Sequence, residues 1–282
     1  MLTISTGSVT GYPGHAHWDY ISRAASSLKG RAVELMVYPT WYGHFGEVAE
    51  EVARMGLKVW GVHADKTLAS GFAETGTGDW DEAISRFTEC ADLAGGLGAS
   101  KVVVHLWGNP RSDECLERNV VSYDALKSIA GERGLELCVE TIPCKVGTPM
   151  DALKRIARDR EGLLATLDLR HLALHNQVYS AVEDAAYDGL WASGAVRQIH
   201  FNDVRAMGGY EGWRDMRPLG KGSIDFGRLM DGLRKRRFAG EMTMESYFLD
   251  GEGAFLAEGF GECVDWLERF HDGVLGGAWV AD

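Results

Sequence analysis

The sequence predicts an α/β fold, a single (β/α)8 TIM barrel over residues 1–282, and three observations predict it. Short apolar runs, typical of buried parallel strands, alternate with longer amphipathic stretches along the whole chain. Eight such strand–helix units, about 35 residues each, match a closed barrel of roughly 250 residues. The first strand is not followed by GxGxxG, the motif of the alternative fold, an open doubly wound sheet.

The expected strands are short runs rich in Val, Ile, Leu and Met. Near-continuous apolar runs indicate strands that are covered on both faces, as in a barrel surrounded by helices. The expected strands are Leu2–Thr6, Ala32–Val37, Lys58–His63, Lys101–His105, Glu136–Glu140, Leu164–Asp168, Arg197–Asn202 and Glu241–Ser246.

The segments between the strands have the spacing of amphipathic helices. Glycine follows many of them, for example Gly56, Gly98 and Gly134, which is typical of helix C-termini. The expected helices lie near His17–Lys29, His44–Met55, Trp80–Leu97, Asp113–Arg133, Pro149–Glu161, Ser180–Ser193, Asp225–Arg237 and Ala254–His271.

Two connecting segments are longer than a simple connection needs. Ala64–Asp79 follows the third strand, and Asp203–Ile224 follows the seventh. Long loops in compact domains are usually functional. Both would lie at the carboxyl ends of the barrel strands, where such barrels place their active sites. We therefore expect the site at that end.

Polar residues end or interrupt most of the expected strands. In strand order they are Glu34, His63, His105, Glu140, Asp168, His200 and Glu245, with His171 three residues after Asp168. An unpaired buried carboxylate is costly, so these groups need partners. Strand ends converge around the mouth of a barrel. We therefore expect four of these side chains to face one another there: Glu140, Asp168, His200 and Glu245.

Three carboxylates that share one site repel unless a cation neutralises them. Oxygen ligands plus one imidazole suit Mn²⁺, Co²⁺, Mg²⁺ or Zn²⁺. The strand ends therefore predict one divalent metal ion, whose identity the residues leave open.

Each of these residues also has a structural explanation. Glu140 could pair with Lys145, and Glu245 with Arg217. Asp168 could cap the turn that follows it, and a histidine in an apolar strand is often a packed core residue. Four such residues on four consecutive strand ends favour one shared site over four separate explanations.

Composition excludes several classes of protein. The chain has 29 Lys and Arg against 41 Asp and Glu, a formal net charge of −12, which disfavours a nucleic-acid binder. Its five cysteines are scattered and form no CxxC pair, which indicates a reduced, cytoplasmic protein. No apolar run approaches the ~18 residues of a membrane span, and the N-terminus lacks the features of a signal peptide, so we expect neither.

At these residues the chain resembles the sugar phosphate isomerase/epimerase family. That family belongs to the xylose isomerase-like TIM barrels, which also include AP endonuclease family 2. The resemblance spans roughly residues 2–270, and the order and spacing of its motifs carry more weight than any one of them. The motifs are VET at Val139–Thr141, LDLRH at Leu167–His171, IHFNDV at Ile199–Val204, LGKGSIDF at Leu219–Phe226 and MES at Met244–Ser246.

The resemblance implies a single-metal site made of Glu140, Asp168, His200 and Glu245. In that site Glu140 and Glu245 are also the acid/base pair, which removes a proton α to a carbonyl and gives a cis-enediolate held by the metal. The implied activity is that of an isomerase or epimerase of a small sugar or keto-polyol. A lyase similar to inosose or dehydroshikimate dehydratase shares the first step and is the main alternative.

The resemblance also implies substrate contacts. His171 corresponds to a substrate-contacting histidine three residues after the metal aspartate, and Arg217 would hold a hydroxyl or phosphate over the mouth. His63 and His105 remain open between substrate contacts, extra metal ligands and core residues. The family resemblance implies a homodimer or a homotetramer, and the residues leave the oligomeric state open.

At two positions the sequence departs from patterns of the family, and both departures bear on which activity it has. Ketose 3-epimerases carry a further glutamate six residues after the first catalytic one, and here that position is Val146. Endonuclease IV, a three-zinc DNA repair nuclease, has an Asp-x-His pair where this chain has Arg214-Asp215-Met216. A ketose 3-epimerase and a nuclease are therefore both disfavoured, and a non-catalytic binding subunit stays open.

Overall fold

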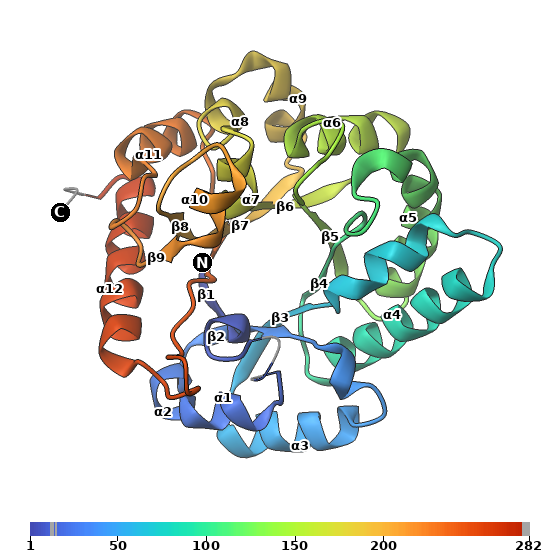
Figure 1. Cartoon of the computed structure of the whole chain (residues 1–282), viewed down its shortest axis with the longest axis horizontal. Helices are drawn as coiled ribbons and strands as arrows, with labels where there is room; N and C mark the ends of the chain where they lie inside the picture. The colour runs from blue at the N-terminus through green and yellow to red at the C-terminus, as the bar shows by residue number, and fades with distance from the viewer. Residues whose placement is uncertain (12–13, 15, 278–282) are drawn as a thin grey trace.

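The computed structural model describes residues 1–11, 14 and 16–277, and its strands close into a barrel. In this described part, eight parallel strands follow one another in the order β1–β10–β7–β6–β5–β4–β3–β2 (Figure 1). The barrel strands are β1 (Leu2–Ser5), β2 (Ala32–Met36), β3 (Lys58–His63), β4 (Lys101–Val104), β5 (Glu136–Glu140), β6 (Leu164–Asp168), β7 (Val196–Phe201) and β10 (Glu241–Met244). The predicted (β/α)8 TIM-barrel fold is confirmed.

Most of the helices form a ring around the barrel, and one short helix lies inside this ring, over the strand ends (Figure 1). The helices are α1 (Asp19–Arg23), α2 (Ala25–Leu28), α3 (Phe45–Met55), α4 (Gly78–Gly96), α5 (Leu116–Gly131), α6 (Pro149–Asp159), α7 (Leu169–Leu174), α8 (Ser180–Glu183), α9 (Asp188–Ala192), α10 (Tyr210–Arg214), α11 (Phe226–Lys235) and α12 (Ala257–Val274). No helix of the described residues is long and apolar enough to cross a membrane.

Local chemistry explains where these helices begin and end. At the start of α6, the hydroxyl of Thr148 accepts a hydrogen bond from the backbone N–H of Asp151, and Pro149 occupies the first turn. At the end of α3, Gly56 has a φ of 65°, which glycine adopts without strain. The boundaries predicted from capping patterns hold to within a few residues for these helices.

Two expected helices are interrupted. The segment His17–Lys29 forms α1 and α2, which are separated by Ala24 with non-helical backbone angles. The segment Ser180–Ser193 is broken at Asp184, whose backbone is extended and whose side chain accepts from the N–H of Ala186. A capping side chain starts a new turn there, so one predicted helix becomes α8, η5 (Ala185–Tyr187) and α9.

Both long loops carry structure of their own. The segment Ala64–Asp79 contains the 3-10 helix η3 (Lys66–Ala73). The segment Asp203–Ile224 contains α10 and a small antiparallel pair, β8 (Asp203–Val204) with β9 (Met216–Arg217). Both follow the carboxyl ends of barrel strands, as predicted.

Apolar and polar residues separate into two layers. The shell between strands and helices is apolar and includes the fully buried side chains of Trp41, Phe87 and Phe201. The inside of the barrel instead buries polar residues, namely Thr3, Glu34, Thr166, Gln198 and Thr243. The shell therefore supplies apolar burial, and the barrel axis supplies a hydrogen-bonded column that leads toward the mouth.

Candidate metal centre

The four predicted metal ligands lie on four neighbouring strands of the barrel. Glu140 ends β5, Asp168 ends β6, His200 lies on β7, and Glu245 directly follows β10. One ligand atom from each lies within 4.8 Å of the others. Oxygen and nitrogen ligands lie about 2.0–2.2 Å from Mg²⁺ or Zn²⁺, so two ligands of one ion are at most about 4.4 Å apart. Small movements of these side chains would suffice to hold an ion.

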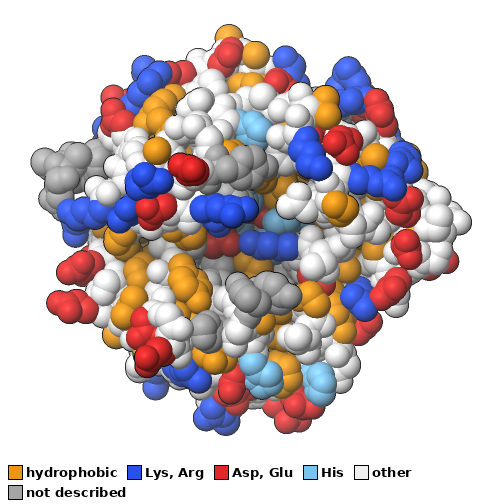
Figure 2. All heavy atoms as spheres, in the orientation of Figure 1, with side chains coloured by type: hydrophobic (Ala, Val, Ile, Leu, Met, Phe, Trp, Pro, Cys, Tyr) orange, Lys and Arg blue, Asp and Glu red, His pale blue; other side chains and the backbone are white. Residues whose placement is uncertain are grey.

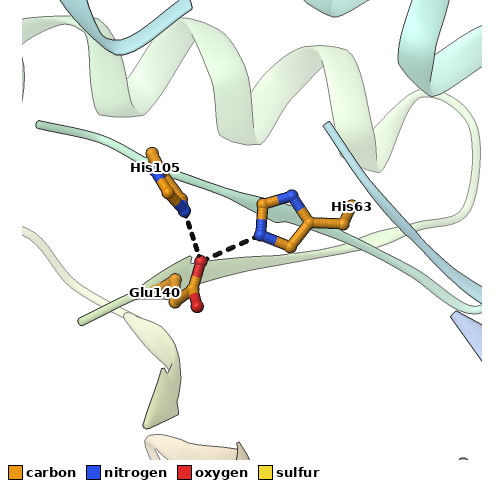
Figure 3. A group of neighbouring side chains, drawn as sticks. All are labelled: His63, His105 and Glu140. Atoms are coloured by element: carbon orange, nitrogen blue, oxygen red, sulfur yellow. Dashed lines mark hydrogen bonds and ion pairs between the residues drawn. The ribbon is translucent and has the colours of Figure 1, made fainter. Parts of the chain in front are cut away.

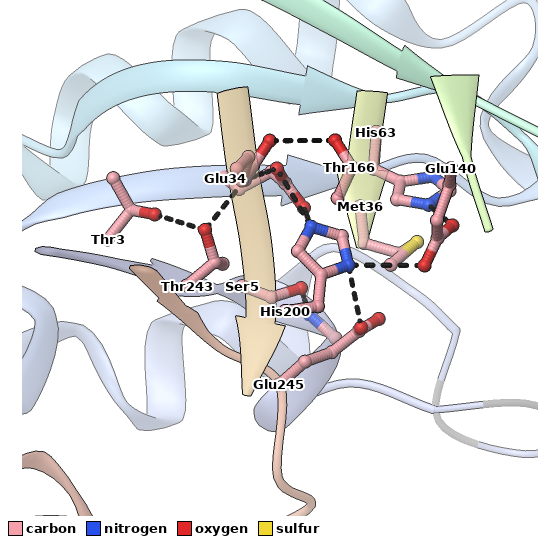
Figure 4. Close-up of polar contacts among 12 residues, drawn as sticks. Thr3, Ser5, Glu34, Met36, His63, Glu140, Thr166, His200, Thr243 and Glu245 are labelled. Carbon is pink, nitrogen blue, oxygen red and sulfur yellow. Dashed lines mark hydrogen bonds and ion pairs between the residues drawn. The ribbon is translucent and has the colours of Figure 1, made fainter. Parts of the chain in front are cut away.

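His200 stands between carboxylates on both sides of its ring (Figure 4). Its Nδ1 is 3.2 Å from Oε1 of Glu140 and 3.0 Å from Oε2 of Glu245. Its Nε2 is 3.1 Å from Oε1 of Glu34, a carboxylate inside the barrel. The imidazole is fully buried, and its Nδ1 faces the mouth while its Nε2 faces the barrel axis.

Asp168 has two structural partners and still faces the cluster. Its Oδ1 accepts from the backbone N–H of His171 at 2.7 Å, so it caps α7. Its Oδ2 accepts from Nδ2 of Asn202 at 3.0 Å, and its backbone N–H donates to the hydroxyl of Thr141 at 2.8 Å. The capping explanation is therefore correct, and the same contacts fix the carboxylate in its place beside the other ligands.

The far side of Glu140 meets two more histidines (Figure 3). Its Oε2 is 2.9 Å from Nε2 of His63 and 2.6 Å from Nε2 of His105. Nδ1 of His63 donates to the carbonyl of Ala64 at 2.8 Å, which orients the ring. These three residues form a second group with metal-ligand spacing that shares Glu140 with the first group.

The other predicted site residues are placed differently. His171 lies at the mouth, and its Nδ1 donates to the carbonyl of Thr141 at 2.7 Å. Arg217 lies on β9, where its guanidinium pairs with Asp215 at 2.8 Å. Its proposed position over a substrate stays a prediction.

Two of the structural explanations for the glutamates do not hold. The partners of Glu245 are His200 and Lys66, whose Nζ lies 3.4 Å from Oε1, while Arg217 pairs with Asp215. The Lys145 ammonium donates to the carbonyl of Pro110 instead of pairing with Glu140. The glutamates of the cluster are thus not balanced by the cations that the sequence suggested.

Two cavities open beside this cluster. One, of about 340 Å³, is lined by His105, Asn109 and Lys145, and the other, of about 390 Å³, by Asp168 and Glu245. Lys66 and His171 line both cavities. Figure 2 shows the hollow at the centre of this face, with Lys and Arg side chains around it. A ligand the size of a monosaccharide would reach the carboxylates from here.

Burial and neighbouring charges push the pKa values of the three carboxyl groups apart. Burial alone raises each of them, because it disfavours the charged form. In Asp168, burial and the charges of Glu245 and Glu140 hold the pKa well above its usual range. The facing imidazoles, His105 first, outweigh burial and hold the pKa of Glu140 well below its usual range. Lys66 and His200 do the same for the pKa of Glu245.

The pKa values of the histidines are also shifted in opposite directions. Burial opposes the charged form of His200, but Glu34 and Glu245 outweigh it and hold its pKa well above the usual range. Burial lowers the pKa of His105 to about 3 and that of His171 to about 4. His105 and His171 are therefore neutral near pH 7. The raised pKa values of His200 and Asp168 favour their protonated forms, with which an incoming cation would compete.

Four residues of the site were assigned no metal-binding, catalytic or substrate-binding role in the sequence analysis. Glu34 contacts His200, Lys66 contacts Glu245, and Asn202 and Thr141 hold Asp168. A glutamate within the apolar run of β2 was the available signal for Glu34, since it must find a buried partner. Lys66 lies in a loop already predicted to be functional, but the spacing does not show which residue of the loop turns inward.

Comparison with known proteins agrees with this architecture. The family model described as xylose isomerase-like TIM barrel matches residues 22–270. No curated protein matches the chain in sequence.

Solved structures with the same fold include three sugar epimerases or epimerase-like proteins. D-allulose 3-epimerase from Methylomonas sp. aligns with a TM-score of 0.68 at 13% identity, over 95% of this chain and 97% of that one. An L-ribulose 3-epimerase aligns with a TM-score of 0.66 at 17% identity, over 94% and 86%. A D-tagatose 3-epimerase-like protein aligns with a TM-score of 0.67 at 18% identity, over 97% and 98%. At these identities the likeness shows the fold.

Proposed function

The chain belongs to the xylose isomerase-like TIM barrel family, and from this premise we propose that it is a divalent-metal-dependent isomerase or epimerase of a small sugar or sugar derivative. The observation that carries the proposal is the arc of Glu140, Asp168, His200 and Glu245 on adjacent strands. Glu140 and Glu245 stand at the two ends of this arc. A substrate bound between them would meet one carboxylate on each side.

The donor set fits a divalent cation. Three carboxylates and one imidazole suit Mn²⁺, Co²⁺, Mg²⁺ and Zn²⁺. When bound, such an ion would polarise a substrate carbonyl and acidify the neighbouring C–H bond. Manganese is our first choice for testing among these metals.

The two glutamates supply the acid/base chemistry. Since the pKa of each is held well below its usual range, both are ionised and able to accept a proton near pH 7. One takes the proton from the carbon next to the carbonyl and leaves an enediolate. The other takes up a proton from water and gives it to the opposite face of the same carbon, which inverts the centre, and the first glutamate then releases its proton to water. Return to the former carbonyl carbon would instead give an isomer.

Neighbouring side chains have supporting roles in this proposal. Lys66, whose side chain is partly exposed, remains protonated, because the charges of Glu245 and Glu140 outweigh its partial loss of solvent and raise its pKa. Its ammonium would stabilise a developing oxyanion. His171 and His105 are neutral and line the cavities, where their rings would contact substrate hydroxyls. Arg217 would join them by leaving Asp215.

The relatives of known structure support a sugar substrate. They include epimerases of D-allulose and L-ribulose, and a D-psicose 3-epimerase crystallised in the presence of D-fructose. The neighbours also include a 3-keto-D-glucoside 4-epimerase, which shows that this fold acts on more than one sugar class. We propose a ketose or keto-polyol and leave its phosphorylation to the assay.

The test is solvent-hydrogen exchange. The protein, loaded in turn with Mn²⁺, Co²⁺, Mg²⁺ and Zn²⁺, is incubated in D₂O with ketoses, their phosphates, keto-inositols and hydroxypyruvate. Deuterium at the carbon next to the carbonyl, seen by NMR, is the expected result. The proposal would be contradicted if the protein binds metal but no substrate shows deuterium exchange with any of the four metals.

The products decide between the related reactions. An inverted centre indicates epimerisation, a moved carbonyl indicates isomerisation, and loss of water with exchange indicates the lyase. Cleavage of abasic DNA by protein that holds two or three Zn²⁺ would support the hydrolytic alternative, in which His63 and His105 become ligands.

We place this activity in the cytoplasm, in a homodimer or a homotetramer, and sedimentation will determine the oligomeric state. All five cysteines are free, which supports a reducing compartment.

A further inference from the structure

We propose that Glu34 is a positioning residue for the metal centre: its carboxylate holds Nε2–H of His200, so that Nδ1 is the nitrogen offered to the metal. This inference rests on the proposed use of a metal. It assigns a role to a residue one layer below the cluster, where a substrate in the two cavities would not touch it.

The geometry of His200 carries the inference (Figure 4). Nε2 lies 3.1 and 3.4 Å from the two oxygens of Glu34, and Nδ1 lies on the other edge of the ring, toward Glu140 and Glu245. A carboxylate oxygen without a proton only accepts, so it favours the imidazole form with hydrogen on Nε2. That form leaves the Nδ1 lone pair free for a metal.

Glu34 is itself fixed by neighbours from other strands. Nε2 of Gln198 donates to its Oε2 at 2.6 Å, and Oε1 of Gln198 accepts from the hydroxyl of Thr166 at 3.2 Å. These two contacts determine which end of the Gln198 amide faces Glu34. The hydroxyl of Thr243 lies 2.6 Å from the same Gln198 nitrogen and 2.6 Å from that of Thr3. The carboxylate is thus held by a buried network that spans the barrel.

Strand geometry links this network to the ligand. Gln198 and His200 are two residues apart on β7, so their side chains point to the same face, the barrel interior. One strand therefore presents both the metal-facing imidazole and the amide that orients its carboxylate partner. Glu34, on β2 across the barrel from β7, contacts both of these side chains.

A carboxylate behind a ligating histidine has a general consequence. It fixes the ring and raises the basicity of the ligand nitrogen, and its loss typically weakens metal binding by about 10–100-fold. Packing alone would not predict this effect. A packing role would lower stability to the same degree with and without metal.

The variant Glu34→Gln keeps the shape and changes the donor pattern. Because Gln198 Nε2 still needs an acceptor, the carbonyl of the new amide turns toward it and the NH₂ group faces His200 Nε2. An NH₂ group donates, so it favours hydrogen on Nδ1, the nitrogen that should bind the metal. The matched control is Glu241→Gln, which removes a carboxylate from the opposite end of the barrel interior.

The experiment is calorimetric titration of Mn²⁺ into the wild type and both variants at one pH, with thermal unfolding followed with and without metal. We expect Glu34→Gln to bind Mn²⁺ about 10–100-fold more weakly, and Glu241→Gln to bind within about twofold of the wild type. Equal affinity of Glu34→Gln and wild type, or an equal loss in both variants, would overturn the inference. A wild type that binds no Mn²⁺, Co²⁺, Mg²⁺ or Zn²⁺ would overturn the proposed function with it.

A second measurement needs no variant, in case Glu34→Gln does not fold. In Zn²⁺-loaded wild-type protein with ¹⁵N-labelled histidine, NMR reports the state of both ring nitrogens of His200. We expect a protonated Nε2 and a metal-bound Nδ1. A metal-bound Nε2, or a proton on Nδ1, would overturn the inference.

Discussion

The two ends of the barrel interior both bury charged side chains, but they balance charge differently. At the amino-terminal end, Lys101 at the start of β4 meets Glu241 at the start of β10, with Nζ 2.5 Å from Oε1. Both side chains are largely buried. The Met1 ammonium also interacts with Glu241, so cations of the chain itself balance this carboxylate.

The carboxyl end instead gathers an excess of acid. Glu140, Asp168 and Glu245 converge there beside the Lys66 ammonium. The other groups in contact that can carry a positive charge are imidazoles, which do so only when protonated: His63, His105, His171 and His200. A pair matched within the chain serves stability, whereas unmatched carboxylates in a buried site need a cation from outside. The difference indicates that this end was built for a ligand and the other for the fold.

The largest expected difference between the two ends is in catalysis. Glu245→Gln should slow solvent-hydrogen exchange of the best wild-type substrate by about 10²–10⁴-fold, because one of the two proton-transferring groups is lost. NMR in D₂O measures the rate. The exposed Glu47→Gln on α3 is the control, and exchange at the wild-type rate in Glu245→Gln would show that this carboxylate does not transfer the proton.

The next effect is on stability at the amino-terminal end. Lys101→Met leaves Glu241 buried without the Lys101 ammonium, which should lower the free energy of unfolding by about 3 kcal/mol. The value is at the low end of the range for buried pairs, because 15% of the Glu241 side chain is exposed. Urea unfolding measures it, and Mn²⁺ affinity should stay unchanged. A marked loss of affinity would mean that the two ends are coupled.

Asp168→Asn, in contrast to Lys101→Met, should raise the free energy of unfolding of the metal-free protein. The folded-state pKa of Asp168 is raised, so its protonated form is favoured in the fold, and stability is lost as the pH rises through that folded pKa. Asparagine does not ionise. The variant should therefore be more stable than the metal-free wild type at pH 7, and nearly equal to it at pH 4.

Unfolding curves at both pH values check this prediction, and excess Mn²⁺ provides the control. Metal should stabilise the wild type and leave Asp168→Asn unchanged. If the metal-free variant is less stable than the metal-free wild type at pH 7, repulsion among the carboxylates does not destabilise the metal-free fold.

The smallest expected effect is the release of protons when the metal binds. Asp168 and His200 both have pKa values held above their usual ranges, so metal binding must compete with protonation at both groups. Mn²⁺ affinity should therefore rise between pH 5 and 7. Titrations in buffers of different ionisation enthalpy should show release of about one proton or more per ion. Heat that is independent of the buffer would contradict this, and Glu241→Gln should release as many protons as the wild type.

The barrel could be predicted because its signals are local. Apolar runs such as that of β4 and the spacing of α6 depend on neighbouring residues, so their pattern survives in one sequence. The break at Asp184 was missed, because its capping hydrogen bond competes with a helix-like pattern. The short helix α7 was missed as well, although a capping role for Asp168 was one of the structural explanations considered.

The convergence of the site was predictable for a related reason. Once the fold is known, strand ends meet, so Glu140, Asp168, His200 and Glu245 follow from their positions in the strands. The contact of Glu34 with His200 depends on ring orientation across the barrel, which spacing does not specify. The inward turn of a loop residue such as Lys66 is equally a tertiary property.

Metal content per chain is the most direct test of the difference between the two ends. It is measured on protein purified without added metal, then after add-back, for the wild type, Asp168→Ala, His200→Ala and the control His175→Ala. The proposed site predicts one ion per chain in the wild type and the control, and none in the two ligand variants. No ion in the wild type after add-back, or an ion that persists in both ligand variants, would contradict it.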